Sequence, residues 1–169
     1  MKIERVEAPT GMTVECDGYV PLVARNVGEL VYCEKYWMTG DCKDTILKFG
    51  IEPASGAICK VTIPLLNQLS QITPPTVEPN AIEDGTPCVD LQCWPESVKF
   101  LEDLGSPVVA MVKDRLVIRF SRGDQKHFHG IRNGRLIYVV NEENDLSGLE
   151  VLDLSPQEID NIMCTLSSA

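Results

Sequence analysis

An Asn133-Gly134 pair between two alternating apolar runs constrains this chain more than any other local feature. Residues 126–132 precede the pair and residues 135–141 follow it, and both runs place apolar side chains at about every second position. A strand alternates its side chains between two faces, and Asn-Gly supplies the positive φ angles of a tight hairpin turn. We therefore predict a β-hairpin with Asn133 and Gly134 as its turn, which sets His129 opposite Tyr138.

The same period-two pattern recurs along the chain and is bounded by turn residues. It predicts further strands over residues 12–16 with a return at 19–20, and over 30–38, 46–51, 57–65, 108–112, 115–120 and 149–154. The turn before the last of these is expected at residues 146–148. Short connections between such strands favour antiparallel pairing.

The pattern changes period after residue 154. Ser155 is a helix N-cap residue, Pro156 suits the first helical position, and Glu158 completes a capping box. Four apolar residues then fall on one helical face: Ile159, Ile162, Met163 and Leu166. We predict a helix over residues 156–167 that buries the first three of them.

These elements predict an α+β fold, made mainly of antiparallel β sheets built from hairpins, with the C-terminal α-helix packed on one face. Its 169 residues fit a single domain, 1–169. Prolines and glycine at residues 68–88 predict an exposed loop, so two half-sheets, 1–70 and 88–169, joined by a Pro-rich loop at 71–87, are one alternative. A faint similarity between residues 55–64 and 147–156 adds an internal duplication as another.

Net charge and cysteine content indicate the cellular compartment of the protein and the partners it avoids. The net charge of −10 repels nucleic acid and anionic membranes, so we expect no direct binding to either. Seven scattered cysteines contain no Cys-x-x-Cys pair, which favours reduced thiols in a cytosol. The N-terminal residues lack the apolar stretch of a signal peptide. We predict a cytoplasmic protein.

The sequence contains no complete group of residues with the types and spacing that catalysis or metal binding requires. His127 and His129 would share a strand face, but there is no third His and no acid between Asp124 and Glu142. Cys93 ends an alternating run rather than standing at a helix N-terminus, where the pKa of its thiol would fall. We therefore predict no catalytic residues, no cofactor and no metal.

The distribution of charge gives the main functional hypothesis. Residues 113–135 hold seven of the fifteen Lys and Arg residues, and only acidic charges follow Arg135. We predict a non-enzymatic protein that binds a basic partner protein, as an acidic inhibitor or an immunity protein covers a toxin nuclease. The candidate contacts are carboxylates in turn-rich segments: Glu78, Glu83, Asp84, Glu142, Glu143 and Asp145.

Two alternatives stay open. One is a site for an anion or small molecule, catalytic or not, on a His- and Arg-lined sheet face. Its residues would be Arg115, Arg119, Arg122, His127, His129 and Tyr138. The other is an assembly subunit whose exposed strands pair with a partner. An acidic patch favours the main hypothesis, a cavity gathering His and Arg favours the first alternative, and an extensive apolar patch favours the second.

Overall fold

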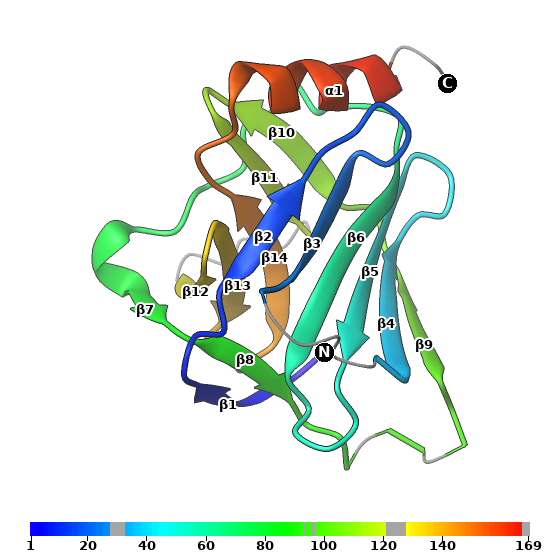
Figure 1. The fold of residues 1–169 in the computed structure, drawn as a ribbon, viewed down its shortest axis with the longest axis vertical. Helices are drawn as coiled ribbons and strands as arrows, with labels where there is room; N and C mark the ends of the chain where they lie inside the picture. The colour runs from blue at the N-terminus through cyan, green and yellow to red at the C-terminus, as the bar shows by residue number, and fades with distance from the viewer. Residues whose placement is uncertain (28–32, 93, 96, 121–127, 167–169) are drawn as a thin grey trace.

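The computed structural model describes residues 1–27, 33–92, 94–95, 97–120 and 128–166, and its strands form two six-stranded sheets (Figure 1). The first sheet has the order β2 (Met12–Glu15), β3 (Leu22–Asn26), β6 (Ile58–Leu66), β5 (Thr45–Ile51), β4 (Lys35–Gly40) and β9 (Phe100–Leu104). The second has the order β10 (Val108–Val112), β11 (Arg115–Arg119), β14 (Leu146–Val151), β13 (Leu136–Asn141), β12 (Phe128–Asn133) and β7 (Ile82–Asp84). A separate pair consists of β1 (Ile3–Glu7) and β8 (Thr86–Val89).

The predicted β-rich fold with a C-terminal helix is confirmed, but the sheets are mixed rather than purely antiparallel. In each sheet five strands pair antiparallel, and one edge strand is parallel to its neighbour: β9 to β4, and β7 to β12. Both parallel strands come from the segment between β6 and β10. A parallel pair needs a long connection, so the hairpin pattern gives no sign of it.

The two sheets repeat one topology. In each, a hairpin lies beside a three-stranded meander in the same spatial order, and the edge of the meander takes up the parallel strand. The residues whose similarity suggested a duplication belong to β6 and β14 with their flanking residues, and these strands hold equivalent places in the two sheets. The repeated strand order supports that alternative.

The segment expected to be an exposed loop, residues 68–88, is partly regular. It contains the 3-10 turn η1 (Pro79–Ala81), the strand β7, and the first residues of β8. Its prolines did not preclude strands, because β7 is a three-residue edge strand and Pro87 lies in a two-stranded pair. Sheet membership also differs from the two half-sheets of the alternative, because β9 comes from the 88–169 half but pairs in the first sheet.

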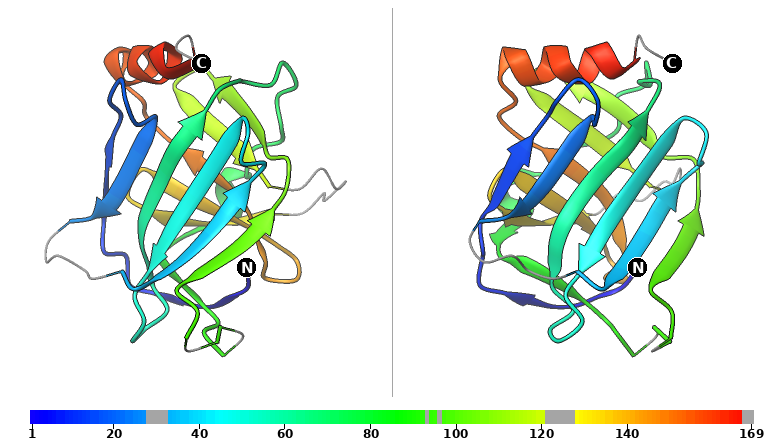
Figure 2. Two further views of the ribbon diagram at one scale, coloured as in Figure 1. Left: turned by 90° about the vertical axis from the view of Figure 1, so that its right-hand side faces the viewer. Right: turned by 45° about the vertical axis from the view of Figure 1, so that its right-hand side comes forward.

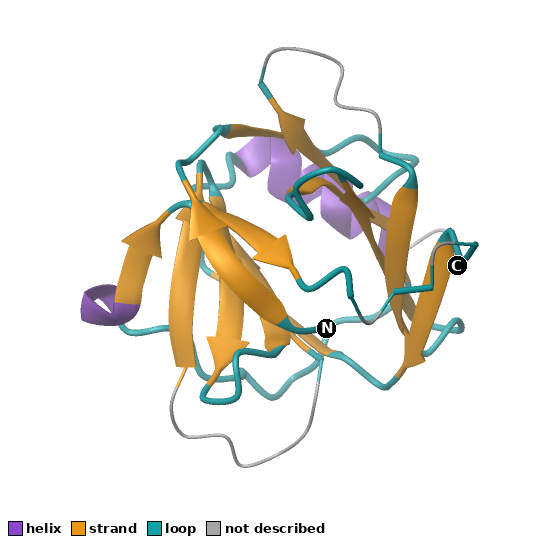
Figure 3. Cartoon of the chain, turned by 90° about the horizontal axis from the view of Figure 1, so that it is seen from below, coloured by secondary structure: helices purple, strands orange, loops and turns teal. Residues whose placement is uncertain are grey.

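Apolar side chains from both sheets form one large buried cluster, which includes Leu47, Phe49, Leu116 and Ile118. The helix α1 (Pro156–Leu166) lies across one end of the two sheets, above β2, β3 and β10 (Figures 1 and 2), instead of on the face of one sheet as predicted. Viewed from below, the helix closes the far end of the space between the sheets (Figure 3). The end of two packed sheets leaves apolar residues open to water, and Ile162, which is fully buried, covers them.

The predicted capping box is present at the start of α1. The Ser155 backbone N–H donates to the Glu158 carboxylate at 2.8 Å, and the Glu158 N–H donates to the Ser155 hydroxyl at 3.3 Å. Arg135 donates to both oxygens of the same carboxylate, at 2.9 and 3.0 Å. Met163, expected to be buried, is 43% exposed. The part of the helix surface that contacts the core is therefore narrower than the apolar face that the sequence predicts.

Three turns differ from their predicted positions. The return strand of the first hairpin, predicted at residues 19–20, is β3 and begins at Leu22. The β12–β13 turn consists of Gly134 and Arg135, so His129 pairs with Val140 and Ile131 pairs with Tyr138. Only the first turn residue, Gly134, has positive φ (65°), the pattern of a type II′ turn. Asn133 is a buried strand residue whose side chain binds the Gly11 N–H and two threonine hydroxyls. The turn predicted at residues 146–148 lies within β14, and the chain reverses just before Asp145.

Six cysteines lie within the described part of the chain, and these six form no disulfide with one another: Cys16, Cys33, Cys42, Cys59, Cys88 and Cys164. Cys93 lies outside it. Across residues 1–27, 33–92, 94–95, 97–120 and 128–166, there is no helix with the length and apolarity that crossing a membrane requires.

Truncation of Ile162 should show how much α1 stabilises the sheets. We expect Ile162→Ala to lower the free energy of unfolding by about 2–5 kcal/mol, because it removes a fully buried side chain. The exposed neighbour Met163→Ala is the control and should change it by less than about 0.5 kcal/mol. Urea denaturation measures both, and equal effects would show that α1 is peripheral.

Acid should weaken the attachment of α1. Hydrogen bonds from Arg135 and Ser155 lower the pKa of Glu158 from 4.5 to about 2. A carboxylate with a depressed folded-state pKa stabilises the fold above its unfolded pKa, and this contribution disappears as pH falls toward the folded value. We expect Glu158→Gln to be less stable than wild type at pH 7, and the difference to shrink from pH 4.5 to pH 2. Urea denaturation at each pH tests this, and a constant difference would contradict it.

Candidate functional site

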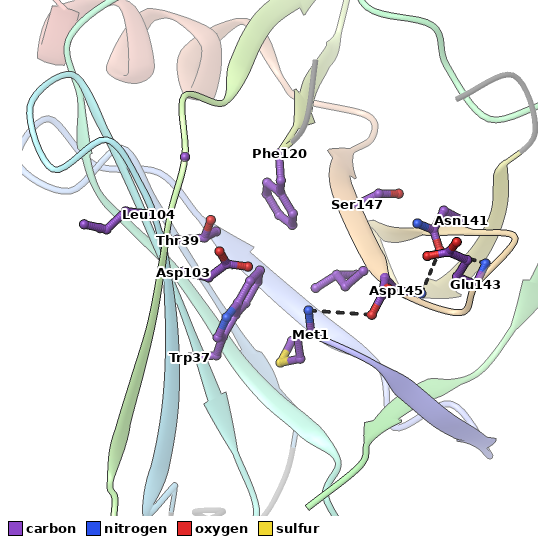
Figure 4. Close-up of a pocket in the computed structure, with 12 residues that line it drawn as sticks. Met1, Trp37, Thr39, Asp103, Leu104, Phe120, Asn141, Glu143, Asp145 and Ser147 are labelled. Atoms are coloured by element: carbon purple, nitrogen blue, oxygen red, sulfur yellow. Dashed lines mark hydrogen bonds and ion pairs between the residues drawn. The ribbon is translucent and has the colours of Figure 1, made fainter. Parts of the chain in front are cut away.

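A cavity of about 390 Å³ opens between the two sheets, near Met1 (Figure 4). Its volume falls in the range of small-molecule sites, roughly 300–1,000 Å³. Residues of β4 and β9 form one wall, and the turn between β13 and β14 forms the other. The lining residues are Met1, Trp37, Thr39, Asp103, Leu104, Gly105, Phe120, Asn141, Glu143, Asp145, Leu146 and Ser147.

The first wall follows from strand periodicity and register. Trp37 and Thr39 are two residues apart on β4, so their side chains share the inner face of the sheet. The parallel register sets Thr39 beside Asp103 of β9, which places the carboxylate and the hydroxyl next to each other. Both β4 residues are 4% exposed, whereas Asp103 stands at the sheet edge and is exposed.

The second wall is a turn fixed by Asn141. The side-chain oxygen of Asn141 accepts the backbone N–H groups of Glu143 and Asp145 at 3.0 and 2.8 Å. Asn144 takes the left-handed conformation, with φ of 62°. This arrangement presents two carboxylates, Glu143 and Asp145, on the side of the cavity opposite Asp103 (Figure 4).

Aromatic rings from both sheets form an apolar surface at the cavity. Trp37 packs against Phe120, with ring centroids 5.6 Å apart, and both contact Phe49 at centroid distances of 5.2 and 6.0 Å. Because Trp37 and Phe49 belong to the first sheet and Phe120 follows β11 of the second, the cluster joins the sheets. The packed rings form a rigid apolar part of the cavity lining, and the carboxylates form its polar part.

A second cavity of about 260 Å³ adjoins the first and shares Met1, Trp37 and Asp103 with it. It adds Asp90 and Glu102, together with Lys2, Trp94 and Leu101. The side chains that line the two cavities therefore comprise five carboxylates and one basic group, Lys2. The Met1 nitrogen lies 3.9 Å from a carboxylate oxygen of Asp145. The site is strongly negative.

The structure separates the acidic residues predicted to contact a partner into two groups. Glu143 and Asp145 line the cavity, and Glu142 lies in the same turn. Glu78 precedes η1, and Glu83 and Asp84 lie on β7. Asp84 pairs with Arg132 at the end of β12 remote from Asn141, and its carboxylate accepts two hydrogen bonds from that guanidinium at 2.7 and 3.2 Å. The second group is therefore separate from the cavity.

Two of the residues predicted for an anion site, Arg115 and Arg119, are engaged by a carboxylate inside the fold. Arg115 and Arg119 both bind the Glu150 carboxylate, at 2.9 and 2.5 Å, and Arg119 is only 4% exposed. Burial lowers the pKa of Arg119, and the hydrogen bond that Arg119 donates to the Glu150 carboxylate opposes that shift.

The other members of this predicted set lie elsewhere. Tyr138 is fully buried, which raises the pKa of its hydroxyl, and it donates to the Met12 sulfur at 2.9 Å. His129 is half-buried on β12. Arg122 and His127 lie outside the described residues.

Sequence reasoning did not include Thr39, Trp37 and Asp103 in any site. Asp103 was detectable only as part of the Glu102-Asp103 pair in a short apolar strand, and the parallel pairing that brings it beside Thr39 is not a local signal. Within the described ranges no group of three or more His, Cys, Asp or Glu side chains is arranged to hold a metal ion.

The buried Glu150 carboxylate should be essential to the fold. We expect Glu150→Gln to lower the free energy of unfolding by about 3–5 kcal/mol, since it leaves the Arg119 charge buried without a counter-charge. The exposed cavity residue provides a matched control, because Glu143→Gln should stay within about 0.5 kcal/mol of wild type. Chemical denaturation compares the free energies of unfolding of the two variants. A Glu150→Gln protein as stable as wild type would contradict the prediction that Arg119 needs this counter-charge.

No protein-family model matches this sequence, and no significant relative is found among curated proteins.

Proposed function

We propose that this is a non-enzymatic protein of the cytosol that binds a basic partner protein through the acidic cavity and its rim. An inhibitor or immunity-type protein that covers the site of a toxin nuclease fits this description. The single observation that carries the proposal is the clustering of Asp103, Glu143 and Asp145 around one opening that contains no arginine.

The electrostatics of the cavity support a cationic partner. The carboxylates of Asp103 and Glu143 receive no hydrogen bond and form no ion pair with other residues in the described ranges, so they have no internal task there. Charges of one sign in a concave, partly apolar site concentrate the field and speed the encounter with an opposite charge. A partner with basic side chains would supply the missing counter-charges.

The pairing of the basic side chains favours this proposal over an anion-binding site. Arg115 and Arg119 are engaged by Glu150, Arg132 by Asp84, and Arg135 by Glu158. Hence each arginine of the predicted basic strip that the structure describes is paired with a carboxylate within the fold, although Arg115 and Arg119 share one.

Removing the negative charges of the cavity should abolish most of the binding to the partner protein. In an extract of the cells that make the protein, a bait tagged after Ala169 keeps Met1 native, and mass spectrometry identifies what it retains. We expect Asp103→Asn/Glu143→Gln/Asp145→Asn to retain the partner at least ~10-fold less than wild type, equivalent to about 1.4 kcal/mol. Association of the purified partner with wild type should slow as salt rises above ~0.15 M.

The control removes the same number of charges elsewhere. Glu34, Asp114 and Asp160 are exposed and lie outside the cavities, so Glu34→Gln/Asp114→Asn/Asp160→Asn should retain the partner as wild type does. An equal loss of partner binding in both variants would show that binding depends on the net charge of the protein and not on the cavity. Unchanged binding by the cavity variant, or a partner with an acidic contact surface, would refute the proposal.

A further inference from the structure

Thr39 is a buried residue whose hydroxyl is open to the cavity. Thr39 is 4% exposed, lines the cavity, and lies beside Asp103 (Figure 4). Residues within the described part of the chain make no hydrogen bond to this hydroxyl, and it is not among their fully enclosed polar atoms without a partner. Its neighbours behave differently, because the buried Ser147 hydroxyl donates to the Val139 carbonyl and the Asn141 oxygen accepts two N–H groups. The Thr39 hydroxyl therefore faces the cavity with its hydrogen-bonding capacity unused by the described residues, and it can bond to a ligand.

The groups around Thr39 are complementary to a compact organic cation. Asp103 stands next to it, and Glu143 and Asp145 lie across the cavity. These carboxylates can only accept hydrogen bonds when ionised, and the threonine hydroxyl can also accept one. An ammonium group has three donors and no acceptor, so it can bond to several of these oxygens at once.

The aromatic surface favours an alkyl chain bearing that cation. Trp37 and Phe120 line the cavity with their ring centroids 5.6 Å apart, and Leu146 adds an apolar side chain. Such rings bury methylene groups and attract a cation placed over their faces. A bare metal ion has no methylene groups to bury against this apolar surface.

We propose that the cavity binds a primary alkylammonium group, with Thr39 and Asp103 as its nearest acceptors and Glu143 and Asp145 as further counter-charges. This inference rests on the proposed function, in which the group is the side chain of a lysine in the partner. A free aliphatic amine offers the same chemistry, so the test separates the two sources.

The probe is n-pentylammonium, and binding is followed by the backbone NMR shifts of Thr39, Asp103 and Phe120. We expect it to bind at least ~10-fold more tightly than 1-pentanol, which has the same chain without the charge. Thr39→Val keeps the shape of the side chain but removes the hydroxyl, and should weaken binding about 5-fold. Asp103→Asn should weaken it at least ~10-fold.

Matched controls keep the test independent of folding. Thr62→Val, on β6 and outside both cavities, and Asp114→Asn should leave the affinity unchanged. Thermal unfolding confirms that each variant is folded. Equal affinity for pentanol, no effect of Thr39→Val, or tighter binding of Ca²⁺ than of the amine at the same residues would overturn the assignment.

Two further probes identify the source of the ammonium group. Nα-acetyl-lysine-N-methylamide should bind as pentylammonium does if the ligand is a lysine of a partner, whereas binding of cadaverine alone would overturn the lysine assignment and support a free amine. The outcome also separates this inference from the proposed function. Loss of the partner in the triple cavity variant without any amine binding would overturn only the ammonium site, and amine binding with full partner retention would overturn only the proposed function.

Discussion

The Glu150 carboxylate, which is completely buried, ties the segment between β6 and β10 to the second sheet. It accepts hydrogen bonds from Arg115, Arg119 and the backbone N–H of Val77, and Arg119 also donates to the carbonyl of Pro75. A buried ion pair needs its remaining hydrogen-bonding capacity satisfied, and here the backbone of residues 75–77 satisfies part of it, whereas Arg119 Nε has no partner among the described residues. The arrangement therefore fixes the path of the connecting segment at the same time as it neutralises a buried charge.

That path determines which sheet each connecting strand can reach. Val77 packs on Ile137 and Val139, on the face of the second sheet that points away from the main core, and β7 then pairs with β12. The chain continues through β8, which pairs with β1, and β9 joins the first sheet beside β4. Asp103 reaches Thr39 only because of this crossing. The candidate site is thus a consequence of the same connection that the buried Glu150 stabilises.

The sequence predicted those features that depend on neighbouring residues. The strands from 46 to 66, the β10–β11 pair and the capped helix follow from alternation, turn residues and the Ser155–Glu158 box. It did not predict β7 and β9, whose parallel partners are far away in the chain. The β12–β13 register was also missed, because Asn133 is held in the strand by Gly11, Thr10 and Thr86 rather than by the turn. Glu143 and Asp145 were candidates from charge alone, whereas Thr39 and Trp37 had no local signal.

Net charge by itself is a poor guide to what this surface attracts, since the position of unpaired charges matters more. The strip of arginines looked like a binding surface in the sequence, but each of its described arginines has a carboxylate partner in the fold. These four arginines share three carboxylates, so the pairing cancels three of the four positive charges in the field that a partner experiences. The carboxylates that remain unpaired then set the local potential, and Asp103 and Glu143 face a cavity with an aromatic lining. Attraction toward the cavity comes from these charges, whereas selectivity within it depends on the Thr39 hydroxyl and the rings, because only a ligand with both a donor and an apolar chain can use them.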